Sequence, residues 1–265
     1  MRIHVIGCSG SFAGPRGAAS GYLLEHEDES GRTWRVLMDL GSGAFGPLQS
    51  VIDPADLDAV IVSHLHPDHY LDLTGLEVFW AYHQRDDLPQ LPIHAPRPLP
   101  ERLSAVLGRS GNIPAGVDCE PFDHHVLEDR RRFSIGPFDI LVREVLHPVE
   151  AYGFRITAGD TVLTYSGDTD TCAALDELAA DADLFLCEAG YIEGRDDRFS
   201  GVHLTGLRAG QAAVASRARR VVLTHIAAWT DPEVPLAEAR SVYDGPLELA
   251  APGAVYELDR ADRAA

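Results

Sequence analysis

The segment Ile61-Val-Ser-His-Leu-His-Pro-Asp-His69 constrains this chain more than any other feature of its sequence. Residues 59–62 are apolar and rich in β-branched side chains, which predicts a buried strand. Four side chains able to bind a metal follow that strand within six positions: His64, His66, Asp68 and His69. Imidazole and carboxylate groups suit zinc, manganese and iron. The fold must therefore present these groups together at the end of a strand, and a metal site is their expected use.

The spacing inside this segment divides the four candidates into two pairs. His64 and His66 are two positions apart, so in an extended turn both can reach one metal. Asp68 and His69 are adjacent and lie just past Pro67, a residue that favours the start of a helix. Such a helix start would direct the second pair at a second metal.

Three later strands are each predicted to end in a single residue of a ligand type. The apolar stretches 140–146, 161–165 and 221–224 lead, in that order, to His147, Asp168 and His225. Loops converge at strand ends, and binding sites gather there. One histidine in such a place is more often a hydrogen-bonded structural residue. Three strand ends together with the four clustered residues favour a shared metal site.

The hydrophobic pattern predicts an α/β protein in which strands dominate each half of the chain. Strands are expected over residues 2–6, 20–25, 35–40, 59–63, 138–146, 152–157, 161–165, 184–188, 220–223 and 247–249. Helices are expected over residues 75–84, 100–109, 173–180, 206–216 and 235–242. The prolines of residues 88–100 predict an extended loop. This order favours two sheets packed face to face with helices outside, built as one domain from residues 1–265.

The charge balance limits the partners that the chain can bind. Lys and Arg total 22 against 41 Asp and Glu, a formal net charge of −19. Proteins that bind long nucleic acids usually carry a basic surface, because affinity comes largely from displacing counterions. The densest basic patch, Arg130-Arg-Arg132, is expected to be a solvated face. A long nucleic acid is therefore not expected as a partner, whereas a small phosphorylated substrate suits a site where metals supply positive charge.

The protein is expected to be cytoplasmic. The first six residues read directly into a strand, so a secretory signal is not expected. No apolar run approaches the roughly 18 residues that a transmembrane helix needs. The cysteines form no Cys-x-x-Cys pair and are expected to be reduced thiols; they are Cys8, Cys119, Cys172 and Cys187.

The ordered series of candidate ligands resembles that of the metallo-β-lactamase superfamily, and the resemblance covers essentially the whole chain. It implies an αββα sandwich made of two mixed β-sheets flanked by helices. It also implies a dinuclear centre with three ligands for the first metal, three for the second and one bridge: His64, His66 and His147; Asp68, His69 and His225; and Asp168. Zinc is the first expectation for both metals, and manganese or iron would also suit these ligands.

The same resemblance implies roles in hydrolysis for residues around the metals. Two metals about 3.5–4 Å apart can share a water and lower its pKa, and the resulting hydroxide would attack phosphorus. Asp68 would accept the proton of this water. His203, oriented by Glu188, would act as the general acid for the leaving oxygen, although it is alternatively a helix cap beside Thr205. Asp39 resembles the aspartate that fixes the tautomer of a ligand imidazole, and is otherwise a turn residue.

Two branches of the superfamily are the most similar: the transfer-RNA 3′-processing endonuclease and bacterial cyclic-nucleotide phosphodiesterases related to it. Four motifs are shared with the phosphodiesterases: Gly7-Cys-Ser-Gly-Ser11, Ala19-Ser-Gly-Tyr22, Leu186-Cys-Glu-Ala189 and Leu223-Thr-His-Ile226. The endonuclease carries a long basic arm where this chain has only residues 148–167. We therefore expect a small cyclic phosphodiester as substrate, first of all 3′,5′-cyclic AMP.

Other functions remain open on the sequence alone. The endonuclease is the first alternative, and a lactonase, thioesterase or arylsulfatase would use the same metals. A metal-binding protein without turnover is a further alternative. Trp80, Tyr82 and Trp229 are candidates for stacking on a base, although the stripe over residues 78–82 also fits core packing. A homodimer is expected by analogy with the superfamily.

Overall fold

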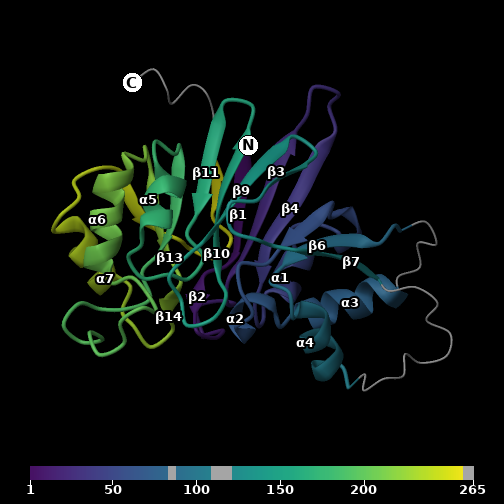
Figure 1. Ribbon diagram of the computed structural model, residues 1–265, viewed down its shortest axis with the longest axis horizontal. Helices are drawn as coiled ribbons and strands as arrows, with labels where there is room; N and C mark the ends of the chain where they lie inside the picture. Colours follow the sequence, from purple (N-terminus) through teal and green to yellow (C-terminus); the bar gives the residue numbers. More distant parts are fainter. Residues whose placement is uncertain (83–87, 109–120, 259–265) are drawn as a thin grey trace.

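Two β-sheets packed face to face form the centre of the molecule, and helices cover the outer face of each sheet (Figure 1). This computed structural model describes residues 1–82, 88–108 and 121–258. The first half of the chain supplies most of one sheet and the second half supplies the other. The architecture is the αββα sandwich that the sequence predicts.

The first sheet joins antiparallel strands to parallel ones. In spatial order its strands are β16 (Val255–Glu257), β1 (Arg2–Gly7), β3 (Gly21–Glu27), β4 (Thr33–Leu40), β5 (Ala59–Ile61), β6 (Leu91–Ala95) and β7 (Phe122–Val126). Neighbours from β16 to β4 pair antiparallel, and neighbours from β4 to β7 pair parallel. The parallel half places the carboxyl ends of β4 and β5 at the same edge.

The second sheet is mixed in the same way. Its strands are β15 (Leu247–Leu249), β13 (Val221–Thr224), β12 (Leu184–Glu188), β11 (Thr161–Tyr165), β10 (Tyr152–Ala158), β9 (Phe138–Glu144) and β8 (Arg132–Ile135). Neighbours from β8 to β11 pair antiparallel, and those from β11 to β15 pair parallel. A short parallel pair lies apart from both sheets: β2 (Ser9–Gly10) and β14 (Ile226–Ala227).

Helices flank the two sheets on opposite sides (Figure 1). Those of the first half are α1 (Phe45–Gln49), a 3₁₀ turn at Pro54–Asp56, α2 (Pro67–Tyr70), α3 (Leu73–Tyr82) and α4 (Leu99–Val106). Those of the second half are α5 (Ala173–Ala179), α6 (Gly206–Ser216) and α7 (Glu233–Arg240). In the described ranges, no helix combines the length and the apolar character needed to traverse a lipid bilayer.

Alternation of side chains along the strands divides the core into layers. Tyr22 and Leu24 of β3 point between the sheets, where they share a cluster with Phe154 and Ile156 of β10. Leu23, between them in sequence, belongs to the cluster under the helices of the first half. Each fully buried side chain of this kind contributes roughly 1.5–3 kcal/mol. The sandwich is therefore held by apolar packing on both faces of each sheet.

Every strand and helix predicted from the sequence has a counterpart in the structure, with ends shifted by a few residues. The predicted helix over residues 75–84 is α3, and its last two residues lie outside the described part of the chain. The predicted helix over residues 100–109 is α4, with residue 109 likewise outside. Cys8, Cys172 and Cys187 are free thiols as predicted, whereas Cys119 falls among the residues that are not described.

The prediction of an extended loop over residues 88–100 is wrong, because this segment contains β6 and the start of α4. Leu91, Ile93 and Ala95 are buried in the first sheet. Pro92 stands just before the part of β6 that pairs with β5, which begins at Ile93. The missing N–H of this proline therefore interrupts no ladder with β5, and the strand tolerates it.

The loops that follow β5, β9, β11, β12 and β13 reach one end of the sandwich. This end also holds α2, β2 and β14, which Figure 1 shows below the sheets, opposite the two chain termini. The loop after β1 runs close to the segment after β13: a Cβ on Gly10 would lie 2.3 Å from the carbonyl oxygen of His225. Only glycine permits this approach, so the small-residue loop at the amino terminus forms part of the wall of this end.

Candidate metal centre

The seven residues predicted as metal ligands come from loops at this end of the sandwich and meet in space. Four lie between β5 and the end of α2, and one follows each of β9, β11 and β13. Their donor atoms form two groups, within each of which all atoms lie less than 4.8 Å apart. The first group is His64, His66, His147 and Asp168, and the second is Asp68, His69, Asp168 and His225. The structure thus brings together all seven side chains, with Asp168 common to both groups.

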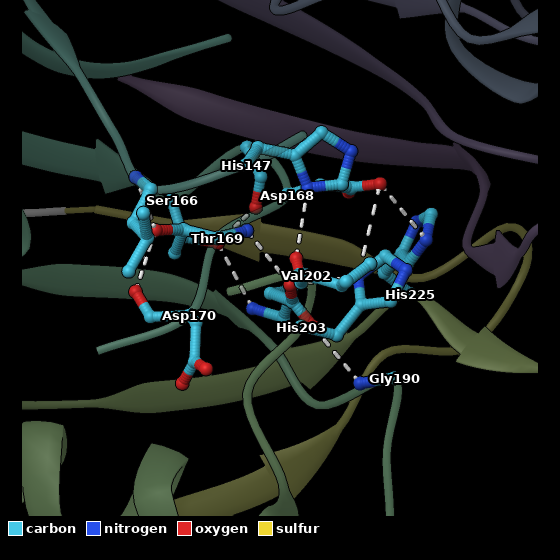
Figure 2. A network of polar contacts seen from close by, with 12 residues as sticks. His147, Ser166, Asp168, Thr169, Asp170, Gly190, Val202, His203 and His225 are labelled. Carbon is cyan, nitrogen blue, oxygen red and sulfur yellow. Dashed lines mark hydrogen bonds and ion pairs between the residues drawn. The ribbon is translucent and has the colours of Figure 1, made fainter. Parts of the chain in front are cut away.

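Distances at Asp168 show how closely the two groups adjoin. Its Oδ2 atom lies 3.2 Å from Nε2 of His69 and 3.2 Å from Nε2 of His225. The same oxygen lies 3.5 Å from Nε2 of His64, which belongs to the other group. Figure 2 shows the contact between Asp168 and His225 from close by. A carboxylate placed between two sets of imidazoles is suited to bridge two cations.

Several buried donor atoms at this point make no hydrogen bond in the described structure. Nε2 of His69, Nε2 of His225 and Oδ1 of Asp168 are buried without a hydrogen bond. Leaving such a group unpaired costs about 1–3 kcal/mol, so native structures avoid it unless a ligand binds there. The three atoms belong to the same group of donors. Nitrogen and carboxylate oxygen are the donor set of zinc and its neighbours, so these residues fit a divalent metal.

Asp39 fixes the orientation of one of these imidazoles. The carboxylate is fully buried at the end of β4 and accepts Nδ1–H of His69 at 2.7 Å. It also accepts hydrogen bonds from the backbone N–H and hydroxyl of Ser63 and from the hydroxyl of Tyr165. With Nδ1 protonated and held, Nε2 of His69 is left as the atom that can bind a metal. The structure therefore places Asp39 behind a candidate ligand, His69.

Two more ligand imidazoles are held through Nδ1. Nδ1–H of His147 donates to the carbonyl oxygen of Val202 at 2.8 Å, a contact drawn in Figure 2. Nδ1 of His225 lies 3.1 Å from the hydroxyl of Ser20. Both contacts leave Nε2 facing the donor group. Val202 is the neighbour of His203, so the loop that carries the proposed acid also orients a candidate ligand.

His203, which is partly buried, pairs with the fully buried Glu188 beside Asp168. Nδ1 of His203 lies 2.9 Å from Oε1 of Glu188, which also accepts the backbone N–H of Thr169. The second carboxylate oxygen accepts the backbone N–H of Gly190. Burial opposes protonation of His203, but the adjacent Glu188 carboxylate outweighs burial and raises the pKa of this histidine to about 9. The hydroxyl of Thr205 caps α6, so that role does not fall to His203.

Of the five histidines among the candidate ligands, four are neutral and one, His69, is protonated. Burial lowers the pKa of four imidazoles and keeps them in the neutral form that a metal requires: His64, His66, His147 and His225. Burial also opposes protonation of His69, but the carboxylates of Asp168 and Asp39 raise its pKa well above the usual range. Burial opposes ionisation of Asp68, yet the neighbouring His69 lowers the pKa of that carboxyl to about 2.

The three aromatic residues proposed to stack on a base have different surroundings. Trp80 is buried under the first sheet and its Nε1–H donates to the carbonyl oxygen of Pro89, so it is a core residue. Tyr82 is exposed at the end of α3. Trp229 lines a cavity of about 260 Å³ together with His203 and His225. Of the three, Trp229 is the one that lies next to the candidate metal centre.

Some residues of the site have no signal in the sequence. Ser20, Ser63 and Tyr165 hold site residues through side-chain hydrogen bonds, but nothing in their residue type or spacing marks that role. Asp170 could have been found, because it follows Asp168 by two positions in an acidic turn. Its carboxylate accepts the backbone N–H of Gly201 at 2.7 Å and thereby anchors the loop that carries His203.

The fold and the site define a hydrolase of the αββα class with a candidate dinuclear centre, and comparison with known proteins agrees. Residues 34–226 match the family model described as "Beta-lactamase superfamily domain". The chain is 39% identical to an uncharacterised protein of Mycobacterium leprae over 265 residues, which cover 99% of this chain and 90% of that protein. It belongs to the metallo-β-lactamase superfamily.

Other relatives are known by activity or structure. The chain is 29% identical to the probable metallo-hydrolase YhfI of Bacillus subtilis, over 97% of this chain and all of that protein. The crystal structure of YhfI superposes with a TM-score of 0.82, at 28% identity over 97% and 99% of the two chains. The chain is also 28% identical to ribonuclease Z of Haloferax volcanii, over 99% and 96% of the two sequences. These similarities identify a metallo-β-lactamase-fold hydrolase.

Proposed function

We propose that this protein is a dinuclear metal-dependent phosphodiesterase that hydrolyses a small cyclic phosphodiester, 3′,5′-cyclic AMP. One observation carries the proposal: two groups of donors share Asp168, and the partly buried His203 lies 3.9 Å from the same carboxylate. A phosphodiester needs charge neutralisation, a nucleophile and a proton for its leaving oxygen. This arrangement provides residues for all three.

The donor set determines how the residues would divide between two cations, which we propose to be zinc. The first would be held by His64, His66 and His147, the second by Asp68, His69 and His225, and Asp168 would serve both. When bound, such a pair of cations acidifies water and neutralises charge on a phosphoryl group. Four of the five ligand imidazoles are neutral and Asp68 and Asp168 are ionised, as the metals require, whereas His69 would release a proton when its metal binds.

Asp68 is suited to take the proton of the attacking water. Its pKa of about 2 keeps it ionised at neutral pH, so it is an acceptor. Its Oδ2 lies 3.5 Å from Nε2 of His69 and 3.7 Å from Nε2 of His225, within the second donor group. A proton acceptor in this place lies next to any water that binds among these donors.

His203 is suited to protonate the leaving oxygen. A pKa of about 9 keeps the imidazole protonated at neutral pH, and Glu188 holds Nδ1–H. Nε2–H is therefore the proton available to a substrate. Because Glu188 also accepts two backbone N–H groups, it cannot easily turn away from His203. The pair supplies a positioned acid, and this fits cleavage of an alkoxide leaving group.

A small substrate is favoured over transfer RNA. The net charge is −19, which would repel a polyanion. Residues 148–167 form little more than the hairpin of β10 and β11, so no protruding arm stands between His147 and Asp168. The similarity to ribonuclease Z keeps the endonuclease as the second candidate.

The deciding experiment combines metal analysis with a substrate panel. Purified protein is assayed for zinc, manganese and iron, and is then incubated with 3′,5′-cyclic AMP, a precursor transfer RNA, and chromogenic esters, lactones and sulfates. We expect two metals per chain and 5′-AMP as the product. Cleavage of the precursor alone would favour the endonuclease, and turnover of only an ester or sulfate would exclude the phosphodiesterase.

Replacing His203 tests the assignment of the acid. We expect His203→Ala to lower kcat by about 10²–10⁴-fold, the usual contribution of a positioned acid. The metal content should stay at the wild-type value, because His203 is outside both sets of proposed ligands. Loss of activity and metal together would instead identify His203 as a structural residue.

A further inference from the structure

A cavity of about 260 Å³ opens next to the proposed acid. Its walls come from three loops that are distant in sequence: Ser11 after β2, residues 190–199 after β12, and Trp229 after β14. His203 and His225 form its inner wall. A substrate whose phosphorus lies at the metal centre can therefore extend into this cavity without leaving the site.

Exposed aromatic side chains gather at this cavity. Of the four large aromatic residues that are exposed in the described ranges, Tyr82 lies elsewhere, while Phe12, Phe199 and Trp229 lie in or against the walls. The rings of Phe12 and Trp229 are 5.0 Å apart, so Phe12 packs against this lining residue. Exposed apolar surface concentrated in one place marks a binding site more often than chance.

A second part of the lining continues the aromatic surface to the proposed acid. Phe199 lies 5.9 Å from the ring of Tyr191, and Tyr191 lies edge-on to His203 at 4.7 Å between ring centroids. Two aromatic walls on separate loops thus border one cavity. A flat, π-rich group is the ligand that such walls accommodate best.

One arginine lines the cavity together with its acidic partner Asp196, and two further arginines contact residues beside the cavity. Arg195 lines it and is held by Asp196 and by the hydroxyl of Thr230. Arg16 donates to the carbonyl oxygen of Thr230 at 3.0 Å, and the guanidinium of Arg198 lies 4.5 Å above the ring of Phe199. A guanidinium held in place in this way donates hydrogen bonds to ring nitrogens and carbonyls.

We propose that this cavity is the nucleobase pocket of the enzyme, in which the base of a nucleoside 3′,5′-cyclic monophosphate stacks on Trp229 and Phe199. The inference rests on the proposed function, because it assumes that the cyclic phosphate lies at the metal centre. The ribose would then pass His203, and the base would enter between the aromatic walls. Arg195 is the donor placed to contact the edge of the base.

Two substrates separate recognition of the base from hydrolysis of the phosphate. One is 3′,5′-cyclic AMP, and the other is its base-free analogue, 1-O-methyl-ribofuranose 3,5-cyclic phosphate. For Trp229→Ala we expect kcat/KM for cyclic AMP to fall about 5- to 140-fold, the range that base–aromatic stacking contributes. The fall with the base-free analogue should be several times smaller. Phe199→Ala should show the same selectivity to a lesser degree.

Tyr82→Ala is the matched control, since it removes an exposed aromatic side chain that does not line the cavity, and it should alter neither rate. Metal content and melting temperature verify that each variant is folded. Equal losses for both substrates, or no loss for either, would refute the pocket while leaving the phosphodiesterase in place. If wild-type protein hydrolysed neither substrate, the proposed function would fail, and this inference with it.

Discussion

The strongest structural prediction concerns Asp39, which supports the metal centre without belonging to either donor group. Its carboxylate accepts four hydrogen bonds: two from Ser63, one from Nδ1–H of His69 and one from the hydroxyl of Tyr165. Asp39 is fully buried and has a φ of +58°, a conformation that few residues other than glycine and asparagine adopt readily. We expect Asp39→Asn to preserve the backbone, because asparagine tolerates this conformation.

The expected loss in Asp39→Asn follows from the number of acceptor oxygens that the new side chain offers. Three of the four donors converge on Oδ2, and an amide offers an oxygen at only one of the two positions. Whichever way the amide turns, at least one buried donor loses its acceptor, which costs about 1–3 kcal/mol. His69 also loses the charge that holds Nδ1 protonated, and changes of this kind lower metal affinity about 10–100-fold.

Metal affinity and stability must be measured separately in this experiment. Competition with a chromogenic chelator gives the affinity of each metal, and denaturant titration of the metal-free protein gives the free energy of unfolding. Asp58→Asn is the matched control: Asp58 accepts the backbone N–H of Arg35 and an Arg32 guanidinium at the opposite end of β5. It should lower stability without changing metal affinity. If Asp39→Asn bound both metals as tightly as wild type, the reasoning would be wrong.

Two further predictions concern the loop that carries His203 and the buried His94 of the first sheet. Asp170→Asn should weaken the hydrogen bond that holds Gly201 and thereby misplace His203. We expect kcat to fall about 10- to 100-fold while metal analysis still finds both metals. Loss of metal would contradict a positioning role for Asp170. Burial, followed by the adjacent His125, lowers the pKa of His94 in the folded protein to about 4. As the pH falls, the unfolded chain therefore binds a proton at His94 before the folded protein does, and the free energy of unfolding decreases between about pH 6.5 and pH 4. His94→Phe should reduce the difference in free energy of unfolding between pH 7 and pH 4 by about 3 kcal/mol, as denaturant titrations of the metal-free protein would measure. If the difference were the same as in the wild type, the role of His94 would be refuted.

Most of the candidate centre was predictable because its residues stand where strands end. His147, Asp168 and His225 each follow an apolar stretch, and strand ends are visible in the sequence as a change from apolar to polar residues. Parallel pairing of β11, β12 and β13 then brings their carboxyl ends to one edge. A sequence pattern combined with this rule is enough to group the ligands.

The supporting contacts could not be predicted, because they join residues that are far apart in the chain and chemically ordinary. Tyr165 is 126 positions from Asp39, and its hydroxyl reaches that carboxylate only after the two sheets have packed together. The strand Phe122–Val126 was missed for a related reason: its Asp-His-His core lacks the apolar alternation that marks a strand. Both features are products of packing and leave no local pattern.

The charges of the site explain how an acidic protein can hold an anionic substrate. Four carboxylates are buried at one point, on Asp39, Asp68, Asp168 and Glu188, and burying an uncompensated carboxylate is very unfavourable. The two divalent cations that we propose would cancel these four charges, and the protonated His203 would leave the site with one positive charge. The attraction is confined to this point, while the surrounding surface repels polyanions. A small cyclic phosphodiester can be attracted by the site without contacting the acidic surface around it. A transfer RNA would also be attracted by the site, but the acidic surface would repel the rest of the molecule.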